Sequence, residues 1–118
     1  MDRQILEQKM KEPAKIYSKE QIFAILQQSI ISTMGDGNPM GHKQLIITAE
    51  ELSELTQEVT KELRGKGNKL GLTEELADVL ICTEYLKMIC YISDEDLNKM
   101  IGIKLESLNE RVLNGTYK

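Results

Sequence analysis

Apolar residues recur at three- and four-residue steps along most of this chain, a spacing that places them on one face of an α-helix. Between positions 43 and 64 the apolar stripe consists of Leu45, Ala49, Leu52, Leu55, Val59 and Leu63. The same period is present over 18–31, 74–92 and 94–113. No convincing strand pattern is present. We therefore predict an all-α, four-helix-bundle-like domain whose apolar stripes meet in one core.

Capping residues predict where the helices begin. Ser18 and Gln21 have the spacing of a capping box, which marks the start of the first helix. Thr73 is predicted to cap the third helix and Ser93 the fourth. The glycine-rich segment 35–41 is predicted to be the loop that separates the first two helices.

The length of 118 residues is that of one ordinary domain. Pro13 stops a short amphipathic stretch, so we expect residues 1–17 to form an N-terminal arm and residues 18–118 to form the single domain. No apolar run approaches the roughly 20 residues that span a bilayer, and the start does not resemble a signal peptide. With only two cysteines, both expected to be reduced thiols, we predict a cytoplasmic protein without membrane partners.

The charge and composition of the chain argue against several classes of function. It carries 15 basic and 19 acidic residues, for a net charge of -4, and aromatic residues make up only 4%. Such a composition argues against nucleic acid as a partner, because it offers neither bulk positive charge nor stacking platforms. A single histidine removes most zinc and Ser-His hydrolase chemistry. Carboxylates are therefore the main side chains available for catalysis or metal binding.

Two pairs of acids lie at helical spacing on consecutive predicted helices. Glu51 and Glu54 are three residues apart, and so are Glu75 and Asp78. Each pair lies at the edge of an apolar stripe, and the short turn between the helices predicts that they run antiparallel, so that the pairs can face each other. Two carboxylates about 5 Å apart repel by roughly 3 kcal/mol at an effective dielectric near 20. A hard divalent cation would offset this repulsion, whereas acids that point separately into solvent need none.

The sequence Glu-Glu-Leu-Ser-Glu at 50–54, followed by Glu-Glu-Leu-Ala-Asp at 74–78, resembles the MazG-type nucleoside triphosphate pyrophosphohydrolases. These enzymes belong to the all-α NTP pyrophosphatase superfamily. Their signature is a Glu-x-x-Glu pair on one helix and a Glu-x-x-Asp pair on the next. The resemblance extends from about Ser18 to Arg111, which is most of the chain.

The resemblance implies Mg²⁺-dependent hydrolysis, with Mn²⁺ as a possible substitute, of a nucleoside or deoxynucleoside triphosphate to the monophosphate and pyrophosphate. The implied metal ligands are Glu51, Glu54, Glu75 and Asp78. Either Glu51 or Glu54 is expected to orient or deprotonate the attacking water, and the sequence does not choose between them. The basic residues expected to bind phosphate are Lys104, Arg111, Lys61 and Arg64.

The family also implies a homodimer or homotetramer, with the substrate enclosed between subunits. The base pocket is expected to use the first helix and the start of the second, where Gln27, Gln28 and Gln44 are available. The alternative hypothesis is a non-catalytic helical interaction module, or a module that binds a nucleotide without cleaving it. In the interaction module the acidic faces are solvated and the apolar stripes dock a partner.

Overall fold

The computed structural model describes residues 1–32 and 41–116, which are mostly helical and contain no strand. In chain order the helices are α1 (Arg3–Met10), α2 (Lys19–Ser32), α3 (His42–Leu63), α4 (Lys69–Ile89) and α5 (Asp94–Leu113). The predicted all-α class is therefore confirmed. Apart from Gly41, the loop predicted at 35–41 lies outside the described residues. None of the described helices combines the length and the apolar character required to cross a bilayer.

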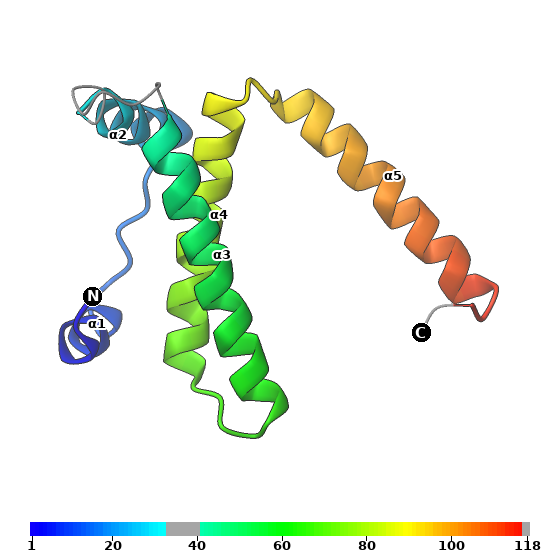
Figure 1. The fold of residues 1–118 in the computed structure, drawn as a ribbon, viewed down its shortest axis with the longest axis horizontal. Helices are drawn as coiled ribbons and strands as arrows, with labels where there is room; N and C mark the ends of the chain where they lie inside the picture. Colours follow the sequence, from blue (N-terminus) through cyan, green and yellow to red (C-terminus); the bar gives the residue numbers. More distant parts are fainter. Residues whose placement is uncertain (33–40, 117–118) are drawn as a thin grey trace. The chain divides into compact units, whose positions relative to one another are not determined.

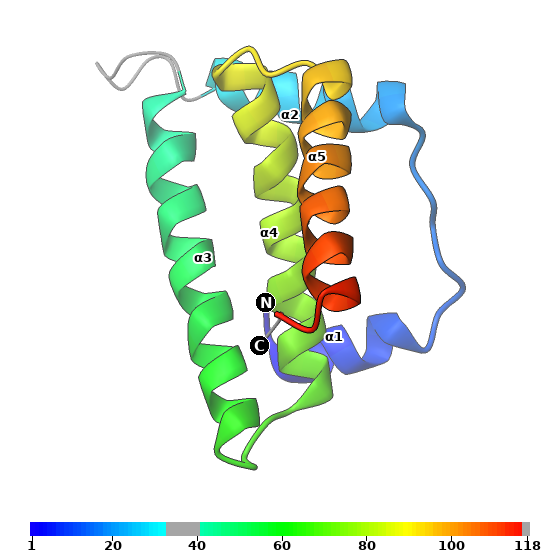
Figure 2. The same ribbon diagram turned by 90° about the vertical axis from the view of Figure 1, so that its right-hand side faces the viewer.

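The chain divides into two compact units, Met1–Tyr85 and Leu86–Lys118. The first unit contains α1, α2, α3 and most of α4, and the second contains the end of α4 together with α5. In the first unit α3 and α4 lie side by side as an antiparallel hairpin, as predicted (Figure 1). Helix α2 lies at the end of the hairpin where α3 begins (Figure 2).

The turn between α3 and α4 is stabilised by backbone geometry that glycine permits. Gly65 has a φ of 72°, in the left-handed region, directly after the last turn of α3. The carbonyl of Lys61 accepts from the N–H of Lys66 at 2.9 Å and from the N–H of Arg64 at 3.1 Å, so the turn satisfies a carbonyl at the end of the helix. This arrangement reverses the chain within a few residues and brings α4 back along α3.

Two of the predicted caps are confirmed. The N–H of Ser18 donates to Gln21 Oε1 at 2.8 Å, and the N–H of Gln21 donates to Ser18 Oγ at 3.1 Å. Ser93 Oγ accepts from the N–H of Asp96 at 3.0 Å, at the start of α5. These side chains satisfy N–H groups that have no partner inside the helix.

The predicted start of α4 at Thr73 is wrong, because Asn68 caps the helix earlier. Asn68 Oδ1 accepts from the N–H of Gly71 at 2.9 Å, so the helix begins at Lys69. Thr73 lies inside the helix, where its hydroxyl donates to the carbonyl of Lys69 at 2.7 Å. The additional turn places Gly71 in the buried part of the hairpin.

Helix α4 ends at Ile89, three residues before the predicted end. Tyr91 follows with a φ of 55°, and the N–H of Ile92 donates to the carbonyl of Lys87 at 3.0 Å. This is the hydrogen-bond pattern of a Schellman motif, with tyrosine where glycine is usual. The left-handed residue therefore stops the helix before the apolar pattern ends.

The prediction that the apolar stripe of α3 forms the core is wrong for this chain. Leu52 is 48% exposed, whereas the buried residues of α3 are Gln44 and Thr48. Gln44, Thr48 and Glu51 repeat the spacing of the stripe one position earlier, which is about 100° around the helix. On α4, Leu80 follows the apolar period predicted over 74–92 and was expected to point inward, but it is 67% exposed. A polar face of α3 is therefore directed toward α4.

Candidate metal centre and adjoining pocket

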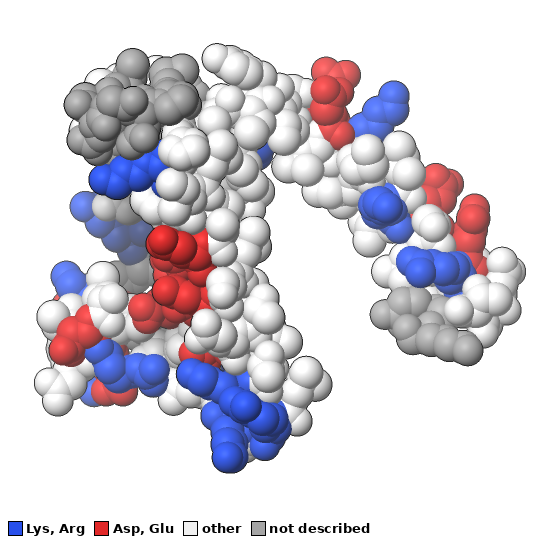
Figure 3. All heavy atoms as spheres, viewed as in Figure 1, with Lys and Arg blue, Asp and Glu red and all other residues white. Residues whose placement is uncertain are grey.

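Carboxylates from α3 and α4 converge along the hairpin. Ligand oxygens of Glu51, Glu54 and Glu75 all lie within 4.8 Å of one another, and those of Glu74, Glu75 and Asp78 form a second such group. Glu75 belongs to both groups, so these five residues form one acid cluster. Figure 3 shows acidic side chains gathered on this face of the first unit. The structure thus brings the two predicted pairs together and adds Glu74.

Two oxygens of the acid cluster lack hydrogen-bond donors. Glu51 Oε2 and Glu75 Oε2 are buried and accept no hydrogen bond from the described residues. Glu74 forms an ion pair with the amino group of Met1, at 3.8 Å. Buried acceptors without donors are costly, and a divalent cation with oxygen ligands would satisfy them. The carboxylate oxygens of the acid cluster therefore fit Mg²⁺ or Mn²⁺ as metal ligands.

The pKa shifts within the acid cluster also fit a bound cation. Burial, followed by the charge of Glu54, raises the pKa of Glu75 to about 7. Burial and the charges of Asp78 and Glu54 raise the pKa of Glu51, and burial raises the pKa of Asp78. Each raised pKa means that the ionised carboxylate is less favourable in the folded chain than it is in water. A bound cation would reverse this preference, because it stabilises all the ionised carboxylates together.

Glu58 lies two turns beyond Glu51 and is neutralised within α3. Lys61 Nζ lies 3.1 Å from Glu58 Oε1. A Cβ atom at Gly71 would lie 3.2 Å from Glu58 Oε2, so glycine allows the carboxylate to approach α4 closely. Lys61, a predicted phosphate ligand, therefore already has an anionic partner, and its role toward phosphate stays a prediction.

The other predicted phosphate-binding residues belong to α5 and to the end of α3. Lys104 and Arg111 are exposed residues of α5, in the second unit. Arg64 is exposed at the C-terminal cap of α3. A role toward phosphate stays a prediction for all three.

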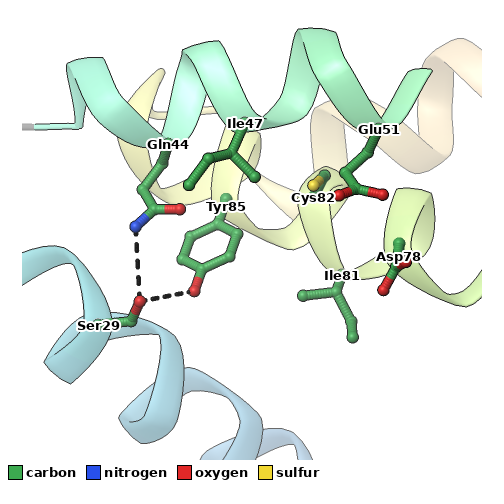
Figure 4. A pocket seen from close by; sticks show the side chains of 8 residues that line it. All are labelled: Ser29, Gln44, Ile47, Glu51, Asp78, Ile81, Cys82 and Tyr85. Atoms are coloured by element: carbon green, nitrogen blue, oxygen red, sulfur yellow. Dashed lines mark hydrogen bonds between the residues drawn. The ribbon is translucent and has the colours of Figure 1, made fainter. Parts of the chain in front are cut away.

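An open pocket of about 240 Å³ adjoins the acid cluster and is lined by residues of α2, α3 and α4 (Figure 4). Its lining consists of Ser29, Gln44, Ile47, Glu51, Asp78, Ile81, Cys82 and Tyr85. Gln44 Nε2 donates a long hydrogen bond of 3.5 Å to Ser29 Oγ, and the Tyr85 hydroxyl donates to the same oxygen at 2.9 Å. Gln27 and Gln28, also predicted to contact a base, are exposed and do not line this pocket.

Three residues of this region were not predicted from the sequence. Glu74 lies four residues before Asp78, and helical spacing alone would have identified it. Ser29 and Tyr85 are 56 positions apart and meet only because α2 packs against the hairpin. No local pattern signals that contact.

Comparison with known proteins finds no match for this chain among family models, curated proteins or solved structures. A function for this chain is therefore inferred from the residues of the site and from the acid motif at 50–54 and 74–78. Three features of the site carry it, namely the converging carboxylates, their buried oxygens and the pocket beside them.

Proposed function

We propose that this protein hydrolyses a nucleoside or deoxynucleoside triphosphate to the monophosphate and pyrophosphate, with Mg²⁺ as its cofactor. The observation that carries the proposal is that carboxylate oxygens of Glu51, Glu54 and Glu75 lie within 4.8 Å of one another, and that two buried oxygens of this group accept no hydrogen bond from any described residue. Hard divalent cations prefer such oxygen ligands and keep positions open for water and phosphate. Glu74 and Asp78 complete the ligand set on the α4 side.

In the proposed reaction the oxygen of a water molecule bonds to the α-phosphorus. The bond from that phosphorus to the α–β bridging oxygen breaks, and pyrophosphate leaves. A proton of the water passes to a carboxylate of α3, for which Glu51 and Glu54 are the candidates. When bound, the metal neutralises charge on the phosphate oxygens and lowers the pKa of the attacking water. Glu75 and Asp78 hold the cation from the opposite helix.

The apolar stripe of α3 supports the further proposal of a homodimer or homotetramer. Leu45, Leu52, Val59 and Leu63 are all exposed in the single chain. Exposed apolar stripes of this kind are typical of surfaces that contact another chain. Lys104 and Arg111 are proposed to contact the phosphates in the assembled enzyme.

The same stripe supports a second candidate function, a non-catalytic helical interaction module. In that case the chain docks a partner through its apolar faces and releases no pyrophosphate. The two candidates differ in what the acid cluster does. An enzyme needs the cluster to be intact, whereas an interaction module becomes more stable once repelling acids are removed.

The deciding experiment measures pyrophosphate release from a panel of NTPs and dNTPs with Mg²⁺. It compares the wild type with Glu54→Ala and Asp78→Ala, and with Glu50→Ala as the matched control. Glu50 is an exposed glutamate on the same helix outside the acid cluster. We expect both cluster variants to lose turnover while circular dichroism shows unchanged helix content, and the control to keep it. Full activity in both cluster variants rejects the proposal.

A further inference from the structure

We propose that the N-terminal arm inhibits the acid cluster, because its positively charged end pairs with Glu74 and has to move away before a divalent cation is bound through that carboxylate. This inference rests on the proposed function, since it concerns the regulation of the same site. It is carried by the ion pair of the Met1 amino group, by the position of Arg3, and by the sparse packing of α1. All these residues belong to the first unit.

The amino group of Met1 is the cationic group of the arm that reaches the acid cluster. It lies 3.8 Å from Glu74 Oε1, and Glu74 shares a group of close ligand oxygens with Glu75 and Asp78. Its charge also acts on the next turn of α4. Burial raises the pKa of Asp78, and the charge of the Met1 amino group opposes that rise. An ammonium group and a divalent cation repel each other at such distances, so each weakens the binding of the other.

Arg3 places a second positive charge of the arm beside the hairpin. A Cβ atom at Gly71 would lie 3.5 Å from Arg3 Nη2. Gly71 precedes Glu75 by four residues, which is about one turn along the same face of α4. The arm therefore directs both charges toward the side of α4 that carries the acid cluster.

The packing of the arm is sparse enough to allow its displacement. Helix α1 lies level with the first part of α4 (Figure 2), yet none of its residues is buried and only Leu6 is partly covered. Residues 13–18, which connect it to α2, have no regular secondary structure. A segment with few buried contacts opens at a small cost in free energy. The contact with the acid cluster is thus one of the few that hold the arm in place.

The two binding events are coupled through Glu74. Because such coupling is reciprocal, a cation that displaces the arm is itself bound less tightly while the arm is in place. The ion pair is partly exposed, so we expect the coupling to change the affinity for the cation by about twofold to fivefold. The arm then acts as a tethered competitor that is released once the cation concentration is high enough.

The first test asks whether a cation releases the arm. NMR relaxation of the untagged full chain gives backbone order parameters for α1 with and without MgCl₂, at matched ionic strength. We expect these order parameters to fall with Mg²⁺ while those of α3 and α4 stay high. Glu54→Ala removes a ligand on α3 and leaves Glu74 in place, so its α1 should not respond. Unchanged or higher order parameters in the wild type, or an equal fall in Glu54→Ala, overturn the inference.

The second test removes the anchor of the arm in place of adding a cation. We expect Glu74→Gln to lower the order parameters of α1 in EDTA, because the ion pair with Met1 is lost. Glu54→Gln is the matched control, since it neutralises an acid of the cluster on the other helix and should leave α1 as it is in the wild type. An arm that stays equally ordered in Glu74→Gln overturns the inference.

The third test measures the reciprocal effect on affinity. Mn²⁺ alone is titrated into the chain, and the free ion is followed by its EPR signal. Nα-acetylation removes the charge of the amino group, so we expect the Kd to fall by about twofold to fivefold, and Arg3→Gln should act in the same direction. Lys9→Gln is the matched control, because Lys9 is an exposed cation in the last turn of the same helix. An unchanged Kd after acetylation, or an equal fall in Lys9→Gln, overturns the inference.

None of these measurements requires turnover, so the inference and the proposed function fail separately. If Mg²⁺ releases the arm but no nucleotide yields pyrophosphate, the inference stands and the proposed function fails. If pyrophosphate is released while α1 and the Kd stay unchanged, the proposed function stands and the inference fails. A chain that binds no Mn²⁺ in any of these forms overturns both.

Discussion

Glu51 and Glu58 lie on the same face of α3, seven residues apart, yet their surroundings are opposite. Three residues after Glu58 stands Lys61, whose ammonium lies 3.1 Å from the carboxylate. Three residues after Glu51 stands Glu54, and Glu75 and Asp78 face it from α4. One glutamate is neutralised by its own helix, whereas the other is surrounded by like charge. Among the described residues Glu51 forms no ion pair, and the one ammonium at the acid cluster, that of Met1, pairs with Glu74, so the charge of Glu51 calls for an external cation or a proton.

The comparison separates a structural carboxylate from a proposed functional one. An ion pair within a helix stabilises the folded chain slightly and needs no ligand. A group of converging acids destabilises the chain unless it binds something, and that cost is characteristic of functional sites. The identity of the residue three positions further along is enough to change one case into the other. Substitution at that position is therefore the most direct way to test the difference.

The largest effect is expected from Glu54→Lys, which gives Glu51 the partner that Glu58 has. An ammonium group beside Glu51 would repel the metal and take up its ligand, so pyrophosphate release should fall by at least about 100-fold. Glu50→Lys makes the same charge change at an exposed position outside the acid cluster and should stay within a few-fold of the wild type. Activity of Glu54→Lys close to that of its control would mean that the acid cluster is not catalytic.

The next effect is stabilisation by the metal. At a Mg²⁺ concentration 100 times its Kd, a ligand that binds only the folded state adds about 2.7 kcal/mol to the free energy of unfolding. We expect that gain at pH 7.5 in urea unfolding of the wild type, measured in MgCl₂ against EDTA at matched ionic strength. Glu54→Lys should show almost none of it. An equal gain in both proteins would place the bound metal elsewhere.

A smaller effect is expected from pH in the absence of metal. The folded chain holds the proton of Glu75 up to a pKa of about 7, whereas the unfolded chain releases it near the ordinary value of 4.5. Between these values the folded state binds more protons, so its stability should fall as pH rises and then level off above 7. Urea unfolding at pH 5.0 and 7.5 measures this difference, and Glu75→Gln should reduce it. Stability that instead rises over this interval would contradict the raised pKa.

The smallest effect is expected from Lys61→Met, which removes the partner of Glu58. Partly exposed pairs within a helix contribute about 0.5 kcal/mol, and added salt screens them. The loss should therefore be clear in urea unfolding at 50 mM NaCl and weaker at 500 mM. A loss that does not depend on salt would mean that packing of the lysine stem, and not its charge, stabilises this end of the hairpin.

The sequence contained enough information to predict the acid cluster but not the direction of the helix faces. Helical spacing determines which residues share a face, so the pairs at 51 and 54 and at 75 and 78 could be recognised in advance. Spacing does not determine which face contacts a neighbour. The stripe containing Leu52 was therefore assigned to the core, whereas the polar face with Gln44 and Thr48 is the buried one.

Helix ends and long-range contacts also depend on tertiary structure, which local sequence patterns do not determine. The start of α4 was misplaced because both Asn68 and Thr73 are residues that can cap a helix, and tertiary structure selects the first. The contact between Ser29 and Tyr85 joins residues 56 positions apart, so no local rule reveals it. The sequence already suggested Gln44 and the first helix for a pocket, but the place of Tyr85 in its lining could be identified only from the structure.

The different exposure of the two cysteines allows ligand binding in this pocket to be followed by chemical labelling. Cys82 lines the pocket and is 4% exposed, and burial raises the pKa of its thiol, whereas Cys90 is exposed. An alkylating reagent should therefore label Cys90 quickly and Cys82 slowly. Mass spectrometry of the two peptides then gives a footprint in which Cys90 is the internal standard, and protection of Cys82 reports a bound molecule without any engineered tag.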